Sequence, residues 1–204
     1  MTAKGSTGRA CVGLALSLLV VAAVSAQERR GEQAEVLCPS VLGVGVNSRT
    51  PFCDIPIHVE PKLGIQVVLP PHDGEATLSF NLHNRHTYSQ EEEQAGRAYT
   101  QYLASIAVAT MEGEVIGEGV VFSEFRTAVD LVDRVTGGAG ASGLKAIAPT
   151  GVERVYVTVP ADVDRLAIVG ESVQIVRLDG RDEFTVVGRP IAILSDATLD
   201  YRPR

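Results

Sequence analysis

Alternation of apolar and polar residues at every second position is the feature that most constrains the fold of this chain. Ala76, Leu78, Phe80 and Leu82 alternate with polar neighbours, and the same pattern recurs in two segments of the C-terminal third. Side chains of a β-strand point to opposite faces in turn, so this pattern predicts strands that are buried on one face.

Turn signals divide the alternating sequence into short segments. Dipeptides that favour turns occur at Asp73-Gly74, Glu112-Gly113, Thr150-Gly151 and Asp179-Gly180. Candidate strands lie at residues 54–58, 64–69, 75–82, 99–111, 114–125, 144–148, 152–159, 164–169, 172–178, 182–187, 190–194 and 197–202. Short strands without long helices between them predict an all-β fold, an antiparallel β-sandwich that is jelly-roll-like, with a closed barrel as the alternative.

Two segments have helical character. Thr127 and Asp130 are spaced as in a capping box, and apolar residues follow at helical spacing, so we expect one or two helical turns there. Residues 89–99 contain good helix formers but no apolar stripe, and we interpret them as a solvated acidic loop.

The N-terminus has the pattern of a secretory signal peptide. Residues 11–26 are small and apolar, and Lys4 and Arg9 precede them. Sixteen residues are fewer than the roughly 20 that cross a bilayer, so we expect cleavage after Ala26 rather than a membrane anchor. The mature protein is then exported, either periplasmic or secreted, and has no membrane association. We expect a flexible segment at residues 27–36 and a single domain at residues 37–204.

The charge of the chain limits its partners. The formal net charge of the 204 residues is −7, and it becomes −9 without residues 1–26, which carry two basic residues and no acidic one. Nucleic acids and anionic membranes attract basic surfaces, so neither is expected as a partner.

Two cysteines, Cys38 and Cys53, remain after removal of the signal peptide. In an exported protein a closely spaced pair predicts a disulfide, which for this loop length stabilises the fold by about 3 kcal/mol. A catalytic thiol is the alternative, but neither cysteine lies in the sequence context of a cysteine nucleophile.

The histidines suggest a possible metal site. A hairpin of residues 64–69 and 75–82 would place His83 and His86 at the same end as His58, near acidic residues at positions 60 and 91–93. Three neutral imidazoles with an open position suit zinc. The alternative is a polar turn at residues 83–86 whose side chains bind loop backbone. A structural calcium ion at the acidic loop is the other cofactor that we consider.

A carbohydrate-binding surface usually contains exposed aromatic rings. The chain has no Trp. Tyr156 is expected to point outward, because it alternates with Val155 and Val157, and Tyr88 and Tyr99 flank the acidic loop. The alternative for such tyrosines is packing in half-buried strand positions.

No spacing in the sequence supports nucleophilic or acid–base catalysis, so we favour a protein that is not an enzyme. The predicted function is an exported, non-catalytic β-sandwich module with a binding or structural role, whose partner is a carbohydrate or another envelope protein. The alternatives are a carbohydrate-binding module and a metal-dependent hydrolase that uses the histidines. The sequence does not define the ligand or the oligomeric state.

Overall fold

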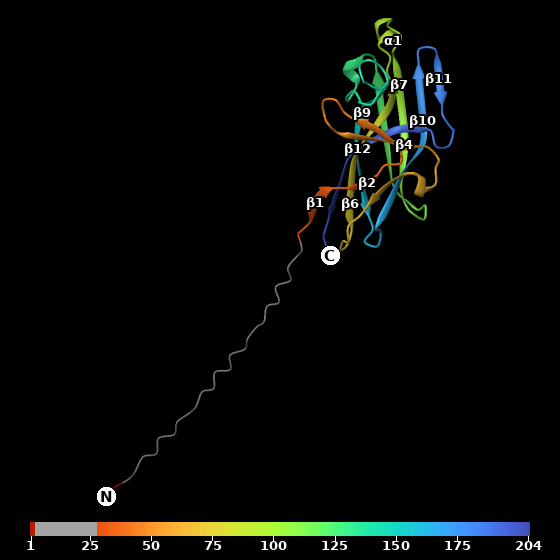
Figure 1. Cartoon of the computed structure of the whole chain (residues 1–204). Coiled ribbons are helices and arrows are strands. Elements are labelled where there is room, and N and C mark those ends of the chain that lie inside the picture. The colour runs from red at the N-terminus through yellow and green to blue at the C-terminus, as the bar shows by residue number, and fades with distance from the viewer. Residues whose placement is uncertain (3–27) are drawn as a thin grey trace.

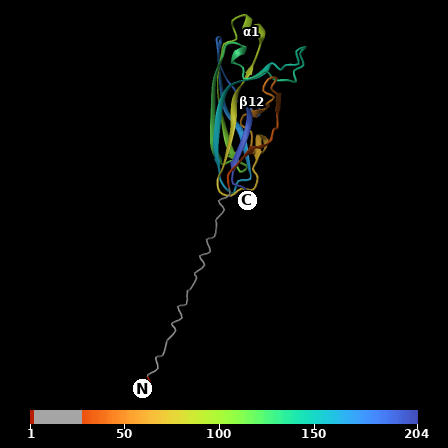
Figure 2. The ribbon, with the colours of Figure 1, turned by 90° about the vertical axis from the view of Figure 1, so that its left-hand side faces the viewer.

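The computed structural model describes residues 1–2 and 28–204. The expected signal peptide lies outside the described residues, apart from Met1 and Thr2. Residues 30–201 form two six-stranded sheets that pack against each other as a β-sandwich (Figures 1 and 2). This confirms the all-β fold class.

The first sheet, sheet A, has the strand order β3-β4-β12-β6-β9, and β1 also pairs with β12. All of these pairings are antiparallel. The strands are β1 (Arg30–Gln33), β3 (Val41–Val44), β4 (Pro51–Pro56), β6 (Ala76–Thr87), β9 (Ile147–Val159) and β12 (Pro190–Tyr201).

The second sheet, sheet B, has the order β2-β5-β10-β7-β8, with β11 also paired to β10. Its pairings are antiparallel as well. The strands are β2 (Glu35–Leu37), β5 (Ile65–Val68), β7 (Thr100–Thr110), β8 (Val115–Phe125), β10 (Arg165–Arg177) and β11 (Gly180–Glu183).

The chain passes between the sheets in the order of a jelly roll. The strands β4, β12, β6 and β9 form one four-stranded unit, and β5, β10, β7 and β8 form the facing unit. This is the arrangement of two interlocked Greek keys, which is the jelly-roll topology.

Three long strands contain β-bulges at positions that we interpreted as gaps between shorter strands. The register shifts near Gly151 in β9, near Gly170 in β10 and near Asp196 in β12. Gly151 and Asp196 have positive φ angles of 67° and 50°. Residues that tolerate this conformation favour a bulge as well as a turn, so the sequence signal is the same for both.

The ordered strands begin before residue 37. We expected residues 27–36 to be a flexible segment, but β1 pairs with β12 in sheet A and β2 pairs with β5 in sheet B. Polar residues suit these short outer strands, because they are mostly exposed.

The main core lies between the sheets and contains the inward-facing residues of both, such as Leu78, Phe80, Ile106 and Ile168. A second, smaller cluster covers the outer face of sheet A. It consists of Leu42, Phe52, Val135 and Ile193, with Ile147 at its margin. Val135 belongs to the long connection between β8 and β9, which therefore buries part of the outer face of sheet A.

Within residues 28–204, helical structure is limited to short turns in the connections. They are η1 (Pro61–Leu63), α1 (Gln90–Gln94) and η2 (Ala128–Asp130). The capping box at η2 is present as expected. The acidic segment expected to be a loop contains α1, because Ser89 accepts a hydrogen bond from the backbone N–H of Glu92 and so caps its first turn.

Three connections meet at one end of the sandwich, which we call the loop end. They are the β6–β7 connection with α1, the β8–β9 connection with η2, and the β10–β11 turn (Figure 1). The backbone N–H of Ala128 donates to Glu93 Oε1 at 3.1 Å, which joins two of these connections. The first described strand and the C-terminus lie at the opposite end (Figure 1).

The Cys38–Cys53 disulfide is present, with the two Cα atoms 5.9 Å apart. Cys38 follows β2 of sheet B, and Cys53 lies in β4 of sheet A. The bond therefore links the sheets covalently near their N-terminal strands.

Candidate functional site

The three histidines proposed for a metal site lie in three different environments. His58 is exposed in the connection between β4 and β5, with a φ angle of 53°. His83 and His86 both lie in β6, which extends to Thr87 because residues 84–87 pair with β9. They are three positions apart, and this odd spacing points their side chains to opposite faces of sheet A.

His83 is held on the outer face of sheet A by two hydrogen bonds. Its Nδ1 is 2.7 Å from the carbonyl oxygen of Gly151, and its Nε2 is 2.8 Å from Ser195 Oγ. A carbonyl oxygen only accepts, so Nδ1 carries the proton and Nε2 accepts from the serine hydroxyl. The ring also meets the edge of Phe52 and is only 1% exposed. Burial lowers the pKa of His83, which keeps the ring neutral.

His86 points between the sheets toward the loop end. Its ring stacks on Phe125 with centroids 3.9 Å apart, and its Nδ1 is 3.0 Å from the hydroxyl oxygen of Tyr102. Burial, with a smaller contribution from the positive charge of Arg177, lowers the pKa of His86 to about 4. The imidazole is therefore neutral at pH 7.

The hydrogen bonds around Tyr102 define which nitrogen of His86 carries the proton. Burial raises the pKa of Tyr102, so its hydroxyl stays protonated. Among the described residues, His86 Nδ1 is the acceptor within hydrogen-bond distance of this hydroxyl, and a buried hydroxyl needs an acceptor for its proton. The phenol then donates its own proton to His86 Nδ1, and the ring proton resides on Nε2.

A cavity of about 310 Å³ lies above His86 at the loop end. The lining comes from the end of β6, the α1 connection, the start of β7 and the end of β10. Its polar members are His86, Thr87, Ser89, Glu92, Arg97, Thr100, Arg177 and Asp179. Among the described residues, His86 Nε2 has no hydrogen-bond partner, so its N–H is available to the cavity.

The charges around this cavity balance. Arg97 binds Glu92 through two hydrogen bonds of 3.0 and 2.8 Å, and Arg177 pairs with Asp182 of β11. Arg97 and Arg177 contribute two positive charges to the lining, and Glu92 and Asp179 contribute two negative charges. With His86 neutral, the lining has no net charge at pH 7.

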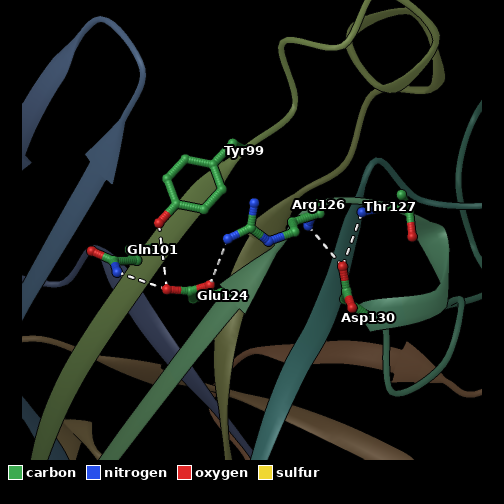
Figure 3. A network of polar contacts seen from close by, with 6 residues as sticks. All are labelled: Tyr99, Gln101, Glu124, Arg126, Thr127 and Asp130. Atoms are coloured by element: carbon green, nitrogen blue, oxygen red, sulfur yellow. Dashed lines mark hydrogen bonds and ion pairs between the residues drawn. The ribbon is translucent and has the colours of Figure 1, made fainter.

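Tyr88 and Tyr99 flank the loop end, but an arginine covers each ring. The guanidinium carbon of Arg134 is 4.1 Å from the ring centroid of Tyr88, and that of Arg126 is 4.7 Å from the ring of Tyr99. The hydroxyl group of Tyr99 donates to Glu124 at 3.4 Å (Figure 3). These contacts hold both rings in place by cation–π attraction and cover one face of each ring.

Glu124 organises the network around Tyr99. It accepts hydrogen bonds from Gln101 at 2.8 Å and Arg126 at 3.1 Å (Figure 3). These bonds, that of Gln101 foremost, lower the pKa of Glu124. The network is exposed and lies outside the cavity lining.

Tyr156 is 70% exposed in β9, as its alternation with buried valines indicates. It pairs with Ser79 on sheet A, so about seven residues of β6, or roughly 23 Å at 3.3 Å per residue, separate its level from that of His86. Tyr156 therefore does not join Tyr88 and Tyr99 in one groove.

The arrangement of metal-ligating side chains and the lengths of the helices bear on the metal and membrane hypotheses. Within residues 1–2 and 28–204, no group of three or more His, Cys, Asp or Glu side chains is placed to hold a metal ion. In the same part of the chain, no helix is long and apolar enough to span a bilayer.

Comparisons with known proteins give little beyond the fold. No protein family matches the sequence, and no curated protein matches it. Among solved structures, the chain is similar to VP2 in the crystal structure of a subviral particle of infectious bursal disease virus, with 9% identity and a TM-score of 0.23. The match covers 84% of this chain and 32% of that chain. We draw no functional conclusion from a similarity this low.

Apart from His86 and Glu92, which we considered for a metal site, the sequence alone did not identify the cavity residues. Arg97 and Arg177 are far apart in the chain, and only the jelly-roll topology brings them to the same end. A partial signal was present in Asp179-Gly180, because a turn between two strands places its flanking residues at an end of the sandwich.

Proposed function

We propose that this protein is an exported, non-catalytic binding module that uses a jelly-roll frame to present a small-ligand site at the loop end. The observation that supports the proposal is a cavity lined by His86. This buried side chain has a hydrogen-bond partner at Nδ1, and its Nε2 is free for a ligand. His86 Nε2 is not among the buried side-chain atoms without a partner, so it is accessible from the cavity, where it can donate to a ligand.

The ionisation of His86 supports binding rather than acid–base catalysis. General acid–base catalysts work best when their pKa lies near the working pH. A pKa of about 4 leaves His86 neutral at pH 7, where it is a poor proton acceptor and has no second proton to give. It can still donate one oriented hydrogen bond.

A ligand screen with cavity-blocking variants tests this function. The mature protein is screened by amide NMR against a library of small polar metabolites. We expect hits that shift the amide signals of Thr100 and Leu178, and we expect Ala98→Trp, which fills the cavity, to abolish them. Ala95→Trp, at the exposed end of α1 outside the lining, is the matched control and should retain binding.

The proposal fails if no library member shifts the loop-end signals, or if Ala98→Trp leaves binding intact. It also fails if a hit is chemically converted by the wild-type protein and not by Ala98→Trp, because the site would then be catalytic.

Export is a separate part of the proposal, supported by the apolar N-terminal segment and by the disulfide. Expression of the full chain in a bacterial host followed by mass spectrometry of the periplasmic fraction tests it. We expect a mature protein that begins at Gln27 and contains an oxidised cysteine pair. An uncleaved chain in the cytoplasm would contradict export.

A further inference from the structure

The volume and the lining of the loop-end cavity indicate the class of its ligand. Its volume of about 310 Å³ is at the low end of small-molecule sites, which commonly measure about 300–1,000 Å³. The cavity therefore suits one compact molecule rather than a polymer segment with many units.

The lining contains both hydrogen-bond donors and acceptors. His86 Nε2–H and the guanidinium groups of Arg97 and Arg177 donate, whereas the carboxylates of Glu92 and Asp179 accept. Hydroxyl groups of Thr87, Ser89 and Thr100 do both. A ligand hydroxyl also donates and accepts, so it matches such a lining more fully than a group that only does one.

Existing ion pairs reduce the attraction of the lining for a charged ligand. The two hydrogen bonds from Arg97 to Glu92 already satisfy a fork of its guanidinium, and Arg177 already faces Asp182. An anion in the cavity would meet Glu92 and Asp179, and a cation would meet the two arginines. Neutral ligands avoid both repulsions.

We propose that the loop-end cavity binds one neutral, polyhydroxylated molecule of the size of a single sugar ring, with His86 Nε2–H donating to one of its hydroxyl oxygens. This inference rests on the proposed function, because it assigns a ligand class to the same site. The fixed imidazole supplies orientation, and the other polar groups of the lining supply contacts to neighbouring hydroxyls. The exposed tyrosines are not part of this site.

A titration panel of defined probes tests the ligand class. Amide and imidazole NMR signals are followed as D-glucose, D-galactose, D-mannose, N-acetyl-D-glucosamine, D-glucuronate, D-glucosamine or inorganic phosphate is added to the mature protein. We expect saturable shifts at His86 and Thr100 with at least one neutral sugar. Glucuronate, glucosamine and phosphate should bind at least tenfold more weakly.

Matched variants assign the hydrogen bond. His86→Phe keeps a ring against Phe125 but removes the N–H, and it should weaken neutral-sugar binding at least tenfold. His58→Phe, at an exposed position far from the cavity lining, should change it less than twofold. Ala98→Trp, which leaves the core intact, should abolish binding even if His86→Phe alters the fold.

Each remaining outcome has a defined meaning. Preferential binding of glucuronate, phosphate or glucosamine at the cavity overturns the neutral class but leaves the binding function standing. Neutral-sugar binding that survives Ala98→Trp overturns the assignment of that ligand to the cavity. If no probe binds while the metabolite library gives a cavity ligand without hydroxyl groups, the ligand class is again wrong and the function stands.

Discussion

His83 and His86 lie on the same strand, and the contrast between their surroundings separates the structural part of this molecule from its proposed binding site. On the outer face of sheet A, both ring nitrogens of His83 have partners and Phe52 covers the ring. At the loop end, His86 has one partner, Tyr102, and faces a cavity. One histidine therefore completes a buried hydrogen-bond network, whereas the other leaves a donor free.

Two further links hold the outer face of sheet A around His83. The disulfide ends at Cys53, next to Phe52, and the carboxylate of Asp133 fixes the β8–β9 connection to the β3–β4 turn through the N–H groups of Asn47 and Ser48. Burial alone would raise the pKa of Asp133, but these hydrogen bonds lower it below its usual value. The carboxylate is thus charged, and it holds the covering segment in place.

The largest expected effect is that of reducing the disulfide. Opening the Cys38–Cys53 bond should lower the free energy of unfolding by about 3 kcal/mol, because the unfolded chain gains entropy. Urea denaturation with and without reductant measures the loss. Amide NMR of the reduced protein should show changes near Phe52 and little change at Thr100. Equal perturbation of the loop end would break the distinction between the two regions.

Removal of the His83 side chain should have the second-largest effect on stability. His83→Ala leaves the carbonyl of Gly151 and the hydroxyl of Ser195 without their partner and opens a hole beneath Phe52. We expect a loss of about 2.5 kcal/mol in urea denaturation. His86→Ala should cost less, because it leaves one hydrogen-bond partner unpaired rather than two. A larger loss for His86→Ala than for His83→Ala would contradict our assignment of roles.

Acid should destabilise the protein partly through His86. Its folded-state pKa of about 4 lies below the ordinary value of 6.5, so the unfolded chain binds a proton that the folded chain excludes between these two pH values. The contribution is fully present above pH 6.5 and is lost as the pH falls through 4, with about 2 kcal/mol of the loss already reached at pH 5.

The pH effect is isolated by comparing the wild-type protein with His86→Phe. Free energies of unfolding measured from pH 7 to pH 4 should fall more steeply for the wild type, whereas His83 contributes equally to both curves. Parallel curves would show that His86 does not titrate as described.

The smallest effect on stability is expected for Glu92→Gln. The Arg97–Glu92 pair is largely exposed, so its loss should leave the free energy of unfolding nearly unchanged. The substitution nevertheless removes one negative charge from the cavity lining. Binding of D-glucuronate should therefore strengthen several-fold relative to the wild type. A stability loss above 1 kcal/mol would mean that this pair has a structural role like that of the His83 network.

The fold could be predicted from local sequence patterns, but the continuity of its strands could not. Alternating residues such as Leu78 and Phe80 indicate a strand with one buried face. Gly151 and Asp196 have the left-handed backbone that also occurs in turns, so each divided one strand into two shorter ones in our prediction. Whether such a residue lies in a turn or in a bulge of a continuous strand depends on the partner strand.

The candidate site could likewise be predicted only in part from the sequence. We placed His83 and His86 in a turn after residue 82, where both could have contributed to one metal site. In β6 their odd spacing places them on opposite faces, and pairing of residues 84–87 with β9 is what extends the strand. Two further lining residues, Arg97 in the β6–β7 connection and Arg177 at the end of β10, have no local sequence signal.

The protonation of the two imidazoles at pH 7 tests the central claim most directly. A long-range ¹H–¹⁵N correlation spectrum of the histidine-labelled mature protein distinguishes the two neutral tautomers and the charged form. We predict that His83 is neutral with its proton on Nδ1 and that His86 is neutral with its proton on Nε2, directed at the cavity. A proton on Nδ1 of His86, or a charged His86 ring, would contradict the proposed donor.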